Sequence, residues 1–166
     1  MGFGLPAAIG AAIGNPGRQV ICVSGDGGAQ MNIQEMATAV ANELPIIFCI
    51  MNNCYLGMVR QWQQLFYGKR YSSTCLRWRK SCQMNCLDRS RCCPPYLPDF
   101  VKLAESYDAL GIRVTKEEEV AAAFERAVQN KKGPTVIEFA IDMGELVLPM
   151  VQAGKALSDM LLEGDI

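Results

Sequence analysis

The amino-acid sequence predicts one α/β domain, built on a doubly wound and mostly parallel sheet with helices on both of its faces. The chain has 166 residues, which is enough for a single domain of ordinary size. Half of the residues are hydrophobic and 20% are charged, as in folded globular proteins. Short apolar runs rich in Val and Ile alternate with amphipathic stretches, and this alternation is typical of βαβ units. We therefore interpret residues 1–166 as one domain.

Four apolar runs are expected to form the strands of this sheet. Each run is short, carries β-branched side chains and is bounded by turn residues, which favours a buried parallel strand over a helix. The expected strands are residues 19–24, 46–51, 111–115 and 135–141.

Amphipathic stretches before and between these strands predict helices. Asp99 is a suitable N-cap for one of them, and Thr115 with Glu118 matches a capping box at the start of another. A shorter amphipathic pattern at 156–162 lies in a C-terminal tail of residues 143–166 and is expected to pack back onto the domain. The expected helices are residues 5–14, 31–43, 55–66, 99–108 and 116–130.

Residues 68–97 differ from the rest of the chain in charge and in cysteine content. Residues 69–91 contain seven Lys or Arg residues and a single Asp, and five of the eight cysteines lie in or beside them. The stretch follows neither the strand period nor the helix period, so we interpret 68–97 as an inserted surface loop and expect residues 72–97 to be poorly ordered. The alternatives are an anion-binding or partner-docking loop, or a zinc or iron–sulfur site. The candidate ligands are Cys75, Cys82, Cys86, Cys92 and Cys93.

Composition also limits the functions that we expect. With 16 basic and 17 acidic residues the net charge is −1, which argues against nucleic acid as a partner. The chain has no histidine, which excludes imidazole catalysis and His-ligated zinc. The longest apolar run, Leu44–Met51, is far shorter than the roughly 20 residues of a membrane span, so we expect no membrane association. The N-terminus lacks the basic segment of a signal peptide, which favours a cytoplasmic location with reduced cysteines.

Polar and glycine residues follow two of the predicted strands. One strand runs into Gly-Asp-Gly-Gly at residues 25–28, and the next ends in Asn-Asn at residues 52–53. Because adjacent parallel strands open into one crevice at their carboxyl ends, Asp26 and Asn53 are expected to approach each other there. Their carboxylate and amide oxygens suit Mg²⁺, while the glycines and the start of a helix near Leu56 suit a phosphate. The two turns therefore predict a site for a magnesium-bound phosphate group.

The spacing of these turns carries a family resemblance. A Gly-Asp-Gly turn followed after 27 positions by the second residue of an Asn-Asn pair resembles the motif of thiamin diphosphate-dependent enzymes. Five longer segments are MGFGLPAAIGAAIGNP (1–16), GDGGAQMNIQEMATA (25–39), LPIIFCIMNN (44–53), LGMVRQWQQLFY (56–67) and LPMVQAGKALSDML (148–161). Together they resemble the C-terminal domain of acetolactate synthase, also called acetohydroxyacid synthase, over nearly the whole chain except the insertion.

The resemblance implies a thiamin diphosphate-binding fold and a role for particular residues. It implies that Mg²⁺ is held by the side chains of Asp26 and Asn53 and by the backbone carbonyl of Tyr55. Met1 would hold thiamin diphosphate in its bent shape, and Trp62 would shape the pocket for a second substrate. No residue of the chain is itself implied to be catalytic. The residues implied to line the diphosphate are Gly27, Gly28, Leu56, Gly57 and Met58.

The activity implied by the resemblance is decarboxylation of pyruvate and transfer of the two-carbon unit to a second 2-oxoacid, pyruvate or 2-oxobutyrate, in branched-chain amino acid biosynthesis. The family enzyme has three domains, and this chain matches the last of them. A glutamate on the pyrimidine-binding domain of a neighbouring subunit starts the family's proton relay, so we expect a homo-oligomer and an inactive isolated chain. FAD is expected only in the full-length enzyme.

Two other functions remain open. The chain resembles domains and separate subunits of other thiamin diphosphate-dependent 2-oxoacid decarboxylases and oxidases. It is also compatible with a non-catalytic module whose Cys-rich loop binds a metal.

Overall fold

The computed structural model describes residues 1–77 and 98–165 of the chain. These residues form a sheet in the order β1-β2-β4-β3, in which every neighbouring pair of strands is parallel. Each strand lies within one residue of its expected bounds. The strands are β1 (Val20–Gly25), β2 (Ile46–Asn52), β3 (Leu110–Val114) and β4 (Thr135–Ala140).

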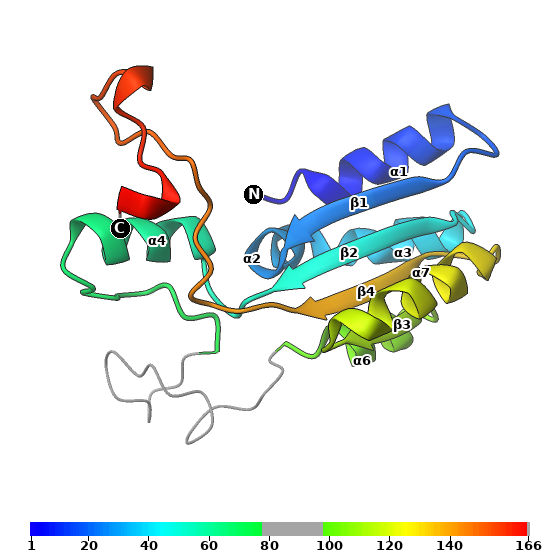
Figure 1. The fold of residues 1–166 in the computed structure, drawn as a ribbon. Helices are drawn as coiled ribbons and strands as arrows, with labels where there is room; N and C mark the ends of the chain where they lie inside the picture. Colours follow the sequence, from blue (N-terminus) through cyan, green and yellow to red (C-terminus); the bar gives the residue numbers. More distant parts are fainter. Residues whose placement is uncertain (78–97, 166) are drawn as a thin grey trace.

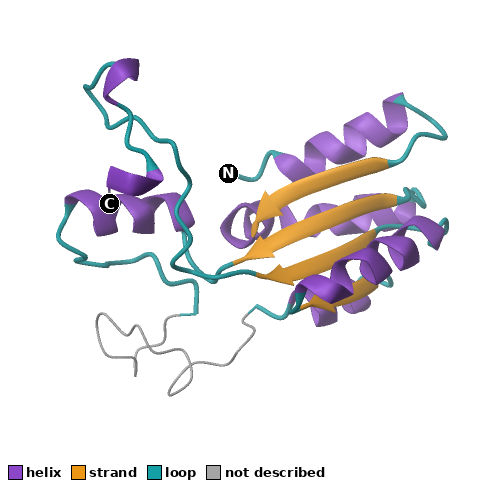
Figure 2. Cartoon of the chain, in the orientation of Figure 1, coloured by secondary structure: helices purple, strands orange, loops and turns teal. Residues whose placement is uncertain are grey.

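Helices cover both faces of the sheet, which confirms the predicted doubly wound α/β class (Figure 1, Figure 2). One apolar core joins one face of the sheet to α1 (Gly4–Gly14), α3 (Met36–Ala41) and α6 (Phe100–Ser106). A second core joins the opposite face to α7 (Val120–Gln129). Strands β2 and β4 are buried between these layers, so other groups reach them at their carboxyl ends.

The expected helix at 31–43 is wrong in its start and in its continuity. Helical structure begins at α2 (Asp26–Ala29), continues as a 3₁₀ segment over Gln30–Glu35 and becomes regular only in α3. Asn32 has non-helical angles (φ −135°, ψ 41°), and its side-chain amide donates a 2.7 Å hydrogen bond to the carbonyl of Gly2. A contact between residues 30 positions apart therefore interrupts a stretch whose local pattern favours one helix.

The two expected helix caps have different outcomes. Asp99 caps α6 as predicted, because its Oδ1 accepts a 3.2 Å hydrogen bond from the backbone N–H of Lys102. The capping box of Thr115 with Glu118 is wrong. Glu119 takes that place, and its Oε2 accepts a 2.8 Å hydrogen bond from the N–H of Thr115. The helical turn starts one residue later than the pattern indicates, which puts Glu119 rather than Glu118 at the capping position.

The helix α4 (Gly57–Phe66) and the C-terminal segment lie together beyond the carboxyl ends of the strands (Figure 1). Gln61 exchanges two hydrogen bonds with the backbone of Val147, at 3.0 and 2.8 Å. Nη1 of the buried Arg60 donates a 2.7 Å hydrogen bond to the carbonyl of Met143. These contacts hold the start of the C-terminal segment against α4.

The tail from residue 143 onward contains little regular helix. Where an amphipathic pattern was expected at 156–162, the structure has a 3₁₀ turn at Leu157–Asp159. Leu157 is 77% exposed, so the apolar side of that pattern lacks the burial that stabilises an amphipathic helix. The tail instead folds back through an antiparallel bridge between Met150 and Leu161, with hydrogen bonds of 3.1 and 2.7 Å.

Residues 74–77, within the predicted surface loop, are packed against the domain. Thr74 and Arg77 are each 2% exposed, and the carbonyl of Thr74 accepts a 2.8 Å hydrogen bond from the N–H of Leu56. The expectation of poor order is therefore wrong for residues 72–77. The remainder of that prediction, and the proposed metal ligands other than Cys75, lie outside the described residues.

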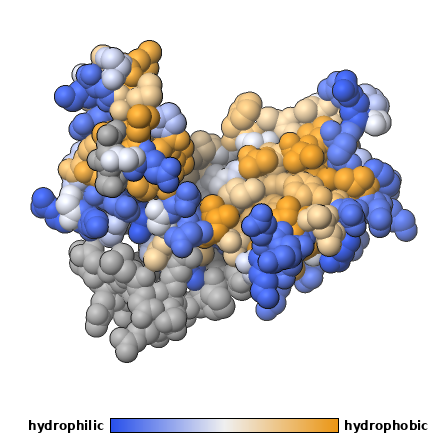
Figure 3. Space-filling model, in the orientation of Figure 1, coloured by the Kyte–Doolittle hydropathy of each residue, from blue (hydrophilic) through white to orange (hydrophobic). Residues whose placement is uncertain are grey.

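On the face of the sheet that α7 covers over β2, β3 and β4, strand β1 is exposed. Ile21 and Val23 of β1 are 53% and 64% exposed, and Figure 3 shows apolar surface over this part of the sheet. Every helix in the described part of the chain is too short or too polar to span a membrane.

A single added methyl group at Gly111 is expected to disturb the contact between α6 and β3. A Cβ atom there would lie 2.8 Å from the backbone carbonyl oxygen of Val101 and 2.9 Å from Val101 Cγ1, so the backbone of α6 has to shift. We expect Gly111→Ala to lower the free energy of unfolding by about 1–3 kcal/mol, measured by urea denaturation. Gly10→Ala in α1 is the matched control, because its Cβ meets no atom within 4 Å and a helical Ala adds about 0.5–1 kcal/mol. Equal stability of the two variants would contradict the prediction.

Candidate functional site

The two turns predicted from the sequence lie at the same edge of the sheet. Gly25, the last residue of β1, pairs with Met51 of β2, so the residues that follow each strand leave the sheet side by side. Asp26 begins α2 directly after β1, and Asn53 follows β2 on the way to α4. The carboxyl ends of the strands point toward α4 (Figure 1).

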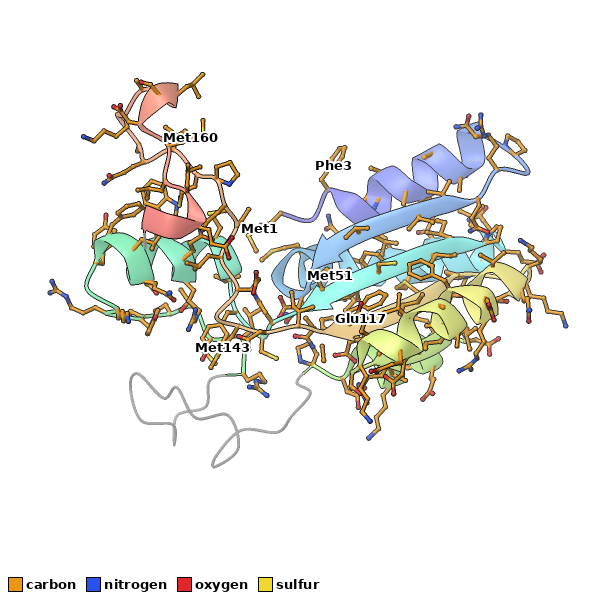
Figure 4. All side chains as sticks on the ribbon, viewed as in Figure 1. Met1, Phe3, Met51, Glu117, Met143 and Met160 are labelled. Carbon is orange, nitrogen blue, oxygen red and sulfur yellow. The ribbon has the colours of Figure 1, made fainter. Side chains whose placement is uncertain are left out.

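The first turn brings together residues from three separate segments. Asp26 is 3% exposed, and its Oδ1 accepts a 3.0 Å hydrogen bond from the N–H of Gly27. A Cβ atom at Gly27 would lie 2.8 Å from Leu56 Cδ2 and 3.5 Å from Met1 Cε. Figure 4 shows Met1 beside the carboxyl ends of the strands, on the side that faces α4. The structure therefore brings together three residues that the sequence assigns to one site, Gly27, Leu56 and Met1.

The second turn has a specific backbone shape. Asn53 Oδ1 accepts a 3.0 Å hydrogen bond from the N–H of Tyr55, and Cys54 between them is in the left-handed region at φ 63°. Tyr55 forms an antiparallel bridge with Cys75. A Cβ atom at Gly57 would lie 2.9 Å from Asn53 Nδ2, so a larger residue there would displace the Asn53 side chain.

A buried polar network lies behind the second turn. Asn52 Nδ2 donates a 2.6 Å hydrogen bond to Glu138 Oε1, and the Glu138 side chain is fully buried in β4. Nε of Arg113 in β3 donates a 3.0 Å hydrogen bond to Glu138 Oε2, and Nη2 forms an ion pair with the same oxygen at 2.9 Å. The same Nη2 contacts the carboxylate of Asp99 at the start of α6. The network therefore joins the end of β2 to β4, β3 and α6.

The charges in this network stabilise one another. Burial by itself raises the pKa of Asp99, but the Lys102 N–H and the Arg113 guanidinium together bring that pKa below its usual value. Burial lowers the pKa of Arg113, and the carboxylates of Glu138 and Asp99 more than reverse this and raise it. Arg113 and Asp99 are accordingly both charged at neutral pH.

Cys22 and Cys49 are not activated thiols. Burial, and then the nearby Cys22, raise the pKa of Cys49 to about 11, and burial also raises the pKa of Cys22. Both are therefore neutral thiols at physiological pH. Within residues 1–77 and 98–165, no three His, Cys, Asp or Glu side chains gather as metal ligands.

Comparison with known families identifies the domain. Residues 1–139, most of the chain, match the family described as "Thiamine pyrophosphate enzyme, C-terminal TPP binding domain". The chain belongs to this family. Thiamine pyrophosphate is another name for thiamin diphosphate, so the cofactor implied by the sequence motifs agrees with the family.

Several relatives of this thiamin diphosphate-binding domain are acetolactate synthases. The chain is 40% identical to the acetolactate synthase large subunit of Haemophilus influenzae, over 98% of the chain and 25% of the relative. It is 43% identical to the large subunit of Corynebacterium glutamicum, over 96% of the chain and 23% of the relative. It is 40% identical to the isozyme 2 large subunit of Escherichia coli, over 97% and 26%. The chain thus spans about a quarter of the length of these relatives.

A solved structure supports the same fold. The thiamine diphosphate-dependent 4-hydroxybenzoylformate decarboxylase of Rhodococcus jostii superposes with a TM-score of 0.68 at 30% identity. The similarity covers 86% of this chain and 23% of that protein. The neighbour is therefore also a much longer thiamin diphosphate-dependent enzyme.

In this thiamin diphosphate-binding domain, Met58 and Trp62 lie on one face of α4, as their four-residue spacing predicts. Both line a groove of about 680 Å³, together with Val59, Gln63, Tyr67 and Arg70. The ring of Trp62 packs edge-to-face on Phe66, with centroids 5.3 Å apart. Met58 is 49% exposed and Met1 77% exposed, so both side chains are accessible from solvent.

Sequence reasoning missed part of the surroundings of the site. Leu76 Cδ1 lies 3.5 Å from the position of a Cβ at Gly27, although Leu76 was assigned to a surface loop. Asn52, Arg113 and Glu138 were not singled out either. A signal was available for Glu138, because it is a charged residue in the middle of the apolar run Thr135–Ala140 and a buried charge requires a partner.

Proposed function

We propose that the chain is the magnesium- and thiamin diphosphate-binding domain of an acetolactate synthase, which decarboxylates pyruvate and transfers the two-carbon unit to a second 2-oxoacid. The observation that carries this proposal is the meeting of the Asp26 turn and the Asn53 turn at one sheet edge, in a chain about 40% identical to acetolactate synthases. Thiamin diphosphate, when bound, supplies the electron sink for decarboxylation of a 2-oxoacid. The chain's own residues bind and orient it.

The donor set favours Mg²⁺ as the metal. We assign its protein ligands as the carboxylate of Asp26, the side-chain oxygen of Asn53 and the backbone carbonyl of Tyr55. All three are hard oxygen donors, and Mg²⁺ commonly combines a few such ligands with phosphate oxygens and water. The hydrogen bonds from Gly27 N–H to Asp26 Oδ1 and from Tyr55 N–H to Asn53 Oδ1 orient the two side chains.

The backbone at the two turns fits a diphosphate group. Side-chain atoms of Leu56 and Ser24 lie 2.8 Å from the Cβ positions of Gly27 and Gly28, so a larger residue at either glycine would have to displace these side chains. The ten-residue helix α4 begins with Gly57 and Met58, and the first N–H groups of a helix have no partner within it. We assign the diphosphate to the N–H groups at the start of α4. Gly27 and Leu56 lie beside it as lining residues, because their own N–H groups donate to Asp26 Oδ1 and to the Thr74 carbonyl. The residues assigned to it are Gly27, Gly28, Leu56, Gly57 and Met58.

Two further side chains are assigned, one to the cofactor and one to the second substrate. Met1 is assigned to the bent middle of thiamin diphosphate, which its position beside Gly27 supports. Trp62 is assigned to the pocket for the second 2-oxoacid, supported by its place in the groove on α4.

Isothermal titration calorimetry tests the proposal: thiamin diphosphate should bind the 166-residue chain measurably more tightly with Mg²⁺ than without divalent metal. Equal affinity in the two buffers would contradict the metal assignment.

Trp62 is expected to affect the choice of acceptor substrate and not the affinity for thiamin diphosphate. In an enzyme completed by adding the remaining domains in trans, we expect Trp62→Leu to change the ratio of 2-oxobutyrate to pyruvate used as acceptor by about 10-fold or more, the size of a lost large apolar contact. Phe124→Leu in α7 is the control, since Phe124 packs in the core between α7 and the sheet, away from the groove on α4. An unchanged ratio would reduce Trp62 to a packing residue.

The isolated chain is expected to form no acetolactate from pyruvate above the background of free cofactor. Asp26 is the one carboxylate among the residues assigned to the cofactor, and we assign it to the metal, which leaves the pyrimidine end without an acid or base. We propose that a glutamate on the pyrimidine-binding domain of a neighbouring subunit, in a cytoplasmic homo-oligomer, supplies that group. A colorimetric acetolactate assay with and without the remaining domains checks this. Acetolactate formed by the chain alone would refute it.

A second candidate is favoured by the Rhodococcus neighbour, whose name describes a decarboxylase. Under this alternative the completed enzyme releases an aldehyde and does not join two 2-oxoacids. Analysis of the products from pyruvate distinguishes the two, because acetolactate and acetaldehyde are different compounds.

A further inference from the structure

The buried network of Asn52, Glu138 and Arg113 contacts the turn that carries the assigned metal ligands Asn53 and Tyr55. We propose that Glu138, clamped by Arg113, is a positioning residue that holds the turn 52–55 in its metal-binding shape by fixing the side chain of Asn52. This inference rests on the proposed magnesium site, since it concerns the turn that supplies two of the three assigned ligands.

Glu138 is held in a single position. Its carboxylate is fully buried. One oxygen accepts a hydrogen bond from Asn52, and the other accepts a hydrogen bond from Arg113 Nε and forms an ion pair with Arg113 Nη2. Arg113 is in turn oriented by Asp99. A buried carboxylate with a forked guanidinium on one side has little freedom to rotate. The oxygen that faces Asn52 is therefore fixed relative to the sheet.

Asn52 links Glu138 to the turn. Its Nδ2 is a donor and bonds to the acceptor Glu138 Oε1. The other end of the amide, Oδ1, therefore points toward the turn. That oxygen accepts hydrogen bonds from the N–H of Cys54 at 3.0 Å and from its Sγ at 3.2 Å. Both ends of one amide are thereby used, and the orientation of the amide is determined by its partners.

The turn needs such a restraint. Cys54 has φ 63°, a conformation that costs a residue with a Cβ free energy and is kept only when its surroundings impose it. Cys54 lies between Asn53 and Tyr55, the two assigned ligands of this turn. A change of Cys54 to a negative φ would alter the position of the Asn53 side chain relative to the Tyr55 carbonyl.

An isosteric change at Glu138 breaks this chain of contacts. In Glu138→Gln one carboxylate oxygen becomes an NH₂ group. The remaining oxygen is drawn to the cation of Arg113, so the NH₂ group faces Asn52 Nδ2, donor against donor. Adding Asn52→Asp restores the pairing. The new carboxylate accepts from that NH₂ group with one oxygen and from the Cys54 N–H with the other, and the total charge of the pair returns to its original value.

Two measurements on the 166-residue chain test the proposal. The first is amide hydrogen exchange by NMR at Cys54, referenced to Ile50 in β2. We expect Glu138→Gln to raise the Cys54-to-Ile50 exchange ratio by about 10-fold or more, because the turn opens while the sheet stays closed. A uniform loss of stability raises both rates together. The second is the affinity for thiamin diphosphate with Mg²⁺, which should fall by about 10- to 100-fold, as for other residues that orient metal ligands.

The controls separate positioning from general destabilisation. Thr135→Val removes the equally buried hydroxyl at the other end of β4, where Asn130 donates to it at 3.0 Å, and should leave both the exchange ratio and the affinity unchanged. The double variant Glu138→Gln/Asn52→Asp should recover both to within about 3-fold of the original chain. An unchanged exchange ratio in Glu138→Gln, or a double variant no better than the single one, would overturn the proposal.

The outcome also distinguishes this inference from the proposed function. If the unmodified chain binds thiamin diphosphate equally with and without Mg²⁺, the magnesium assignment fails, and the exchange ratio alone decides whether Glu138 holds the turn. If binding depends on Mg²⁺ and Glu138→Gln leaves it unchanged, the proposed function stands and the positioning role of Glu138 is refuted.

Discussion

The Asp26→Ala variant is expected to bind thiamin diphosphate with the same low affinity in the presence and absence of Mg²⁺. Asp26 is the one charged ligand of the three that we assign, so its loss leaves the charge of the metal and diphosphate poorly balanced. Loss of a residue that merely orients a ligand typically weakens a metal site by 10- to 100-fold, so we expect at least about 100-fold weaker Mg²⁺-dependent binding here. Calorimetric titration in matched buffers with Mg²⁺ or a chelator measures the difference.

Two further variants control for the shape of the turn. Asp26→Asn keeps an oxygen that can accept the hydrogen bond from Gly27 N–H, so it removes the charge with little change in the backbone. It should lose most of the Mg²⁺ dependence as well. Asp159→Ala removes an exposed carboxylate from the C-terminal tail and should have no effect. Retained Mg²⁺ dependence in both Asp26 variants would show that the metal is held elsewhere.

The second large effect is expected on stability, from Arg113→Ala. Removing this guanidinium leaves the fully buried carboxylate of Glu138 with Asn52 but without a cation. Breaking one side of a buried ion pair typically costs about 3–5 kcal/mol, which is a large part of the stability of a domain. We expect a loss of this size in the free energy of unfolding, measured by urea denaturation monitored through far-UV circular dichroism.

A second substitution separates the buried charge from the lost packing. Arg113→Ala combined with Glu138→Gln should be more stable than Arg113→Ala alone, because no charge remains buried without a partner. Arg126→Ala, at the exposed end of α7, should change stability by less than about 0.5 kcal/mol. A double variant less stable than Arg113→Ala would show that the cost comes from packing and not from the unpaired carboxylate.

Local pattern was sufficient for the elements that depend on neighbouring residues. The strands were predicted within one residue, since each is an apolar run bounded by turn residues. Asp99 was recognised as a cap because a capping side chain and its N–H partner are only three residues apart. The Gly-Asp-Gly and Asn-Asn turns were found because they directly follow strands that end at the same edge of the sheet.

Other features depended on contacts that no local pattern contains. The helix after β1 is interrupted at Asn32 by a hydrogen bond to Gly2, 30 positions earlier. Residues 72–77 were expected to be poorly ordered because of their composition. Thr74 and Arg77 are nevertheless buried, and the backbone of Thr74 and Leu76 is hydrogen-bonded to the segment that precedes α4. A solvated surface loop and a packed segment with polar residues have similar composition, so the sequence alone did not distinguish them.

The sequence by itself determined the fold class, the two turns and the family to which they belong, because periodicity and motif spacing are properties of nearby residues. Only the tertiary structure decided the strand order β1-β2-β4-β3 and the pairing of Asn52 with Glu138, which are 86 positions apart. A buried carboxylate has to find its donors wherever the packed chain provides them, and that choice is made by the whole fold rather than by the residues beside it.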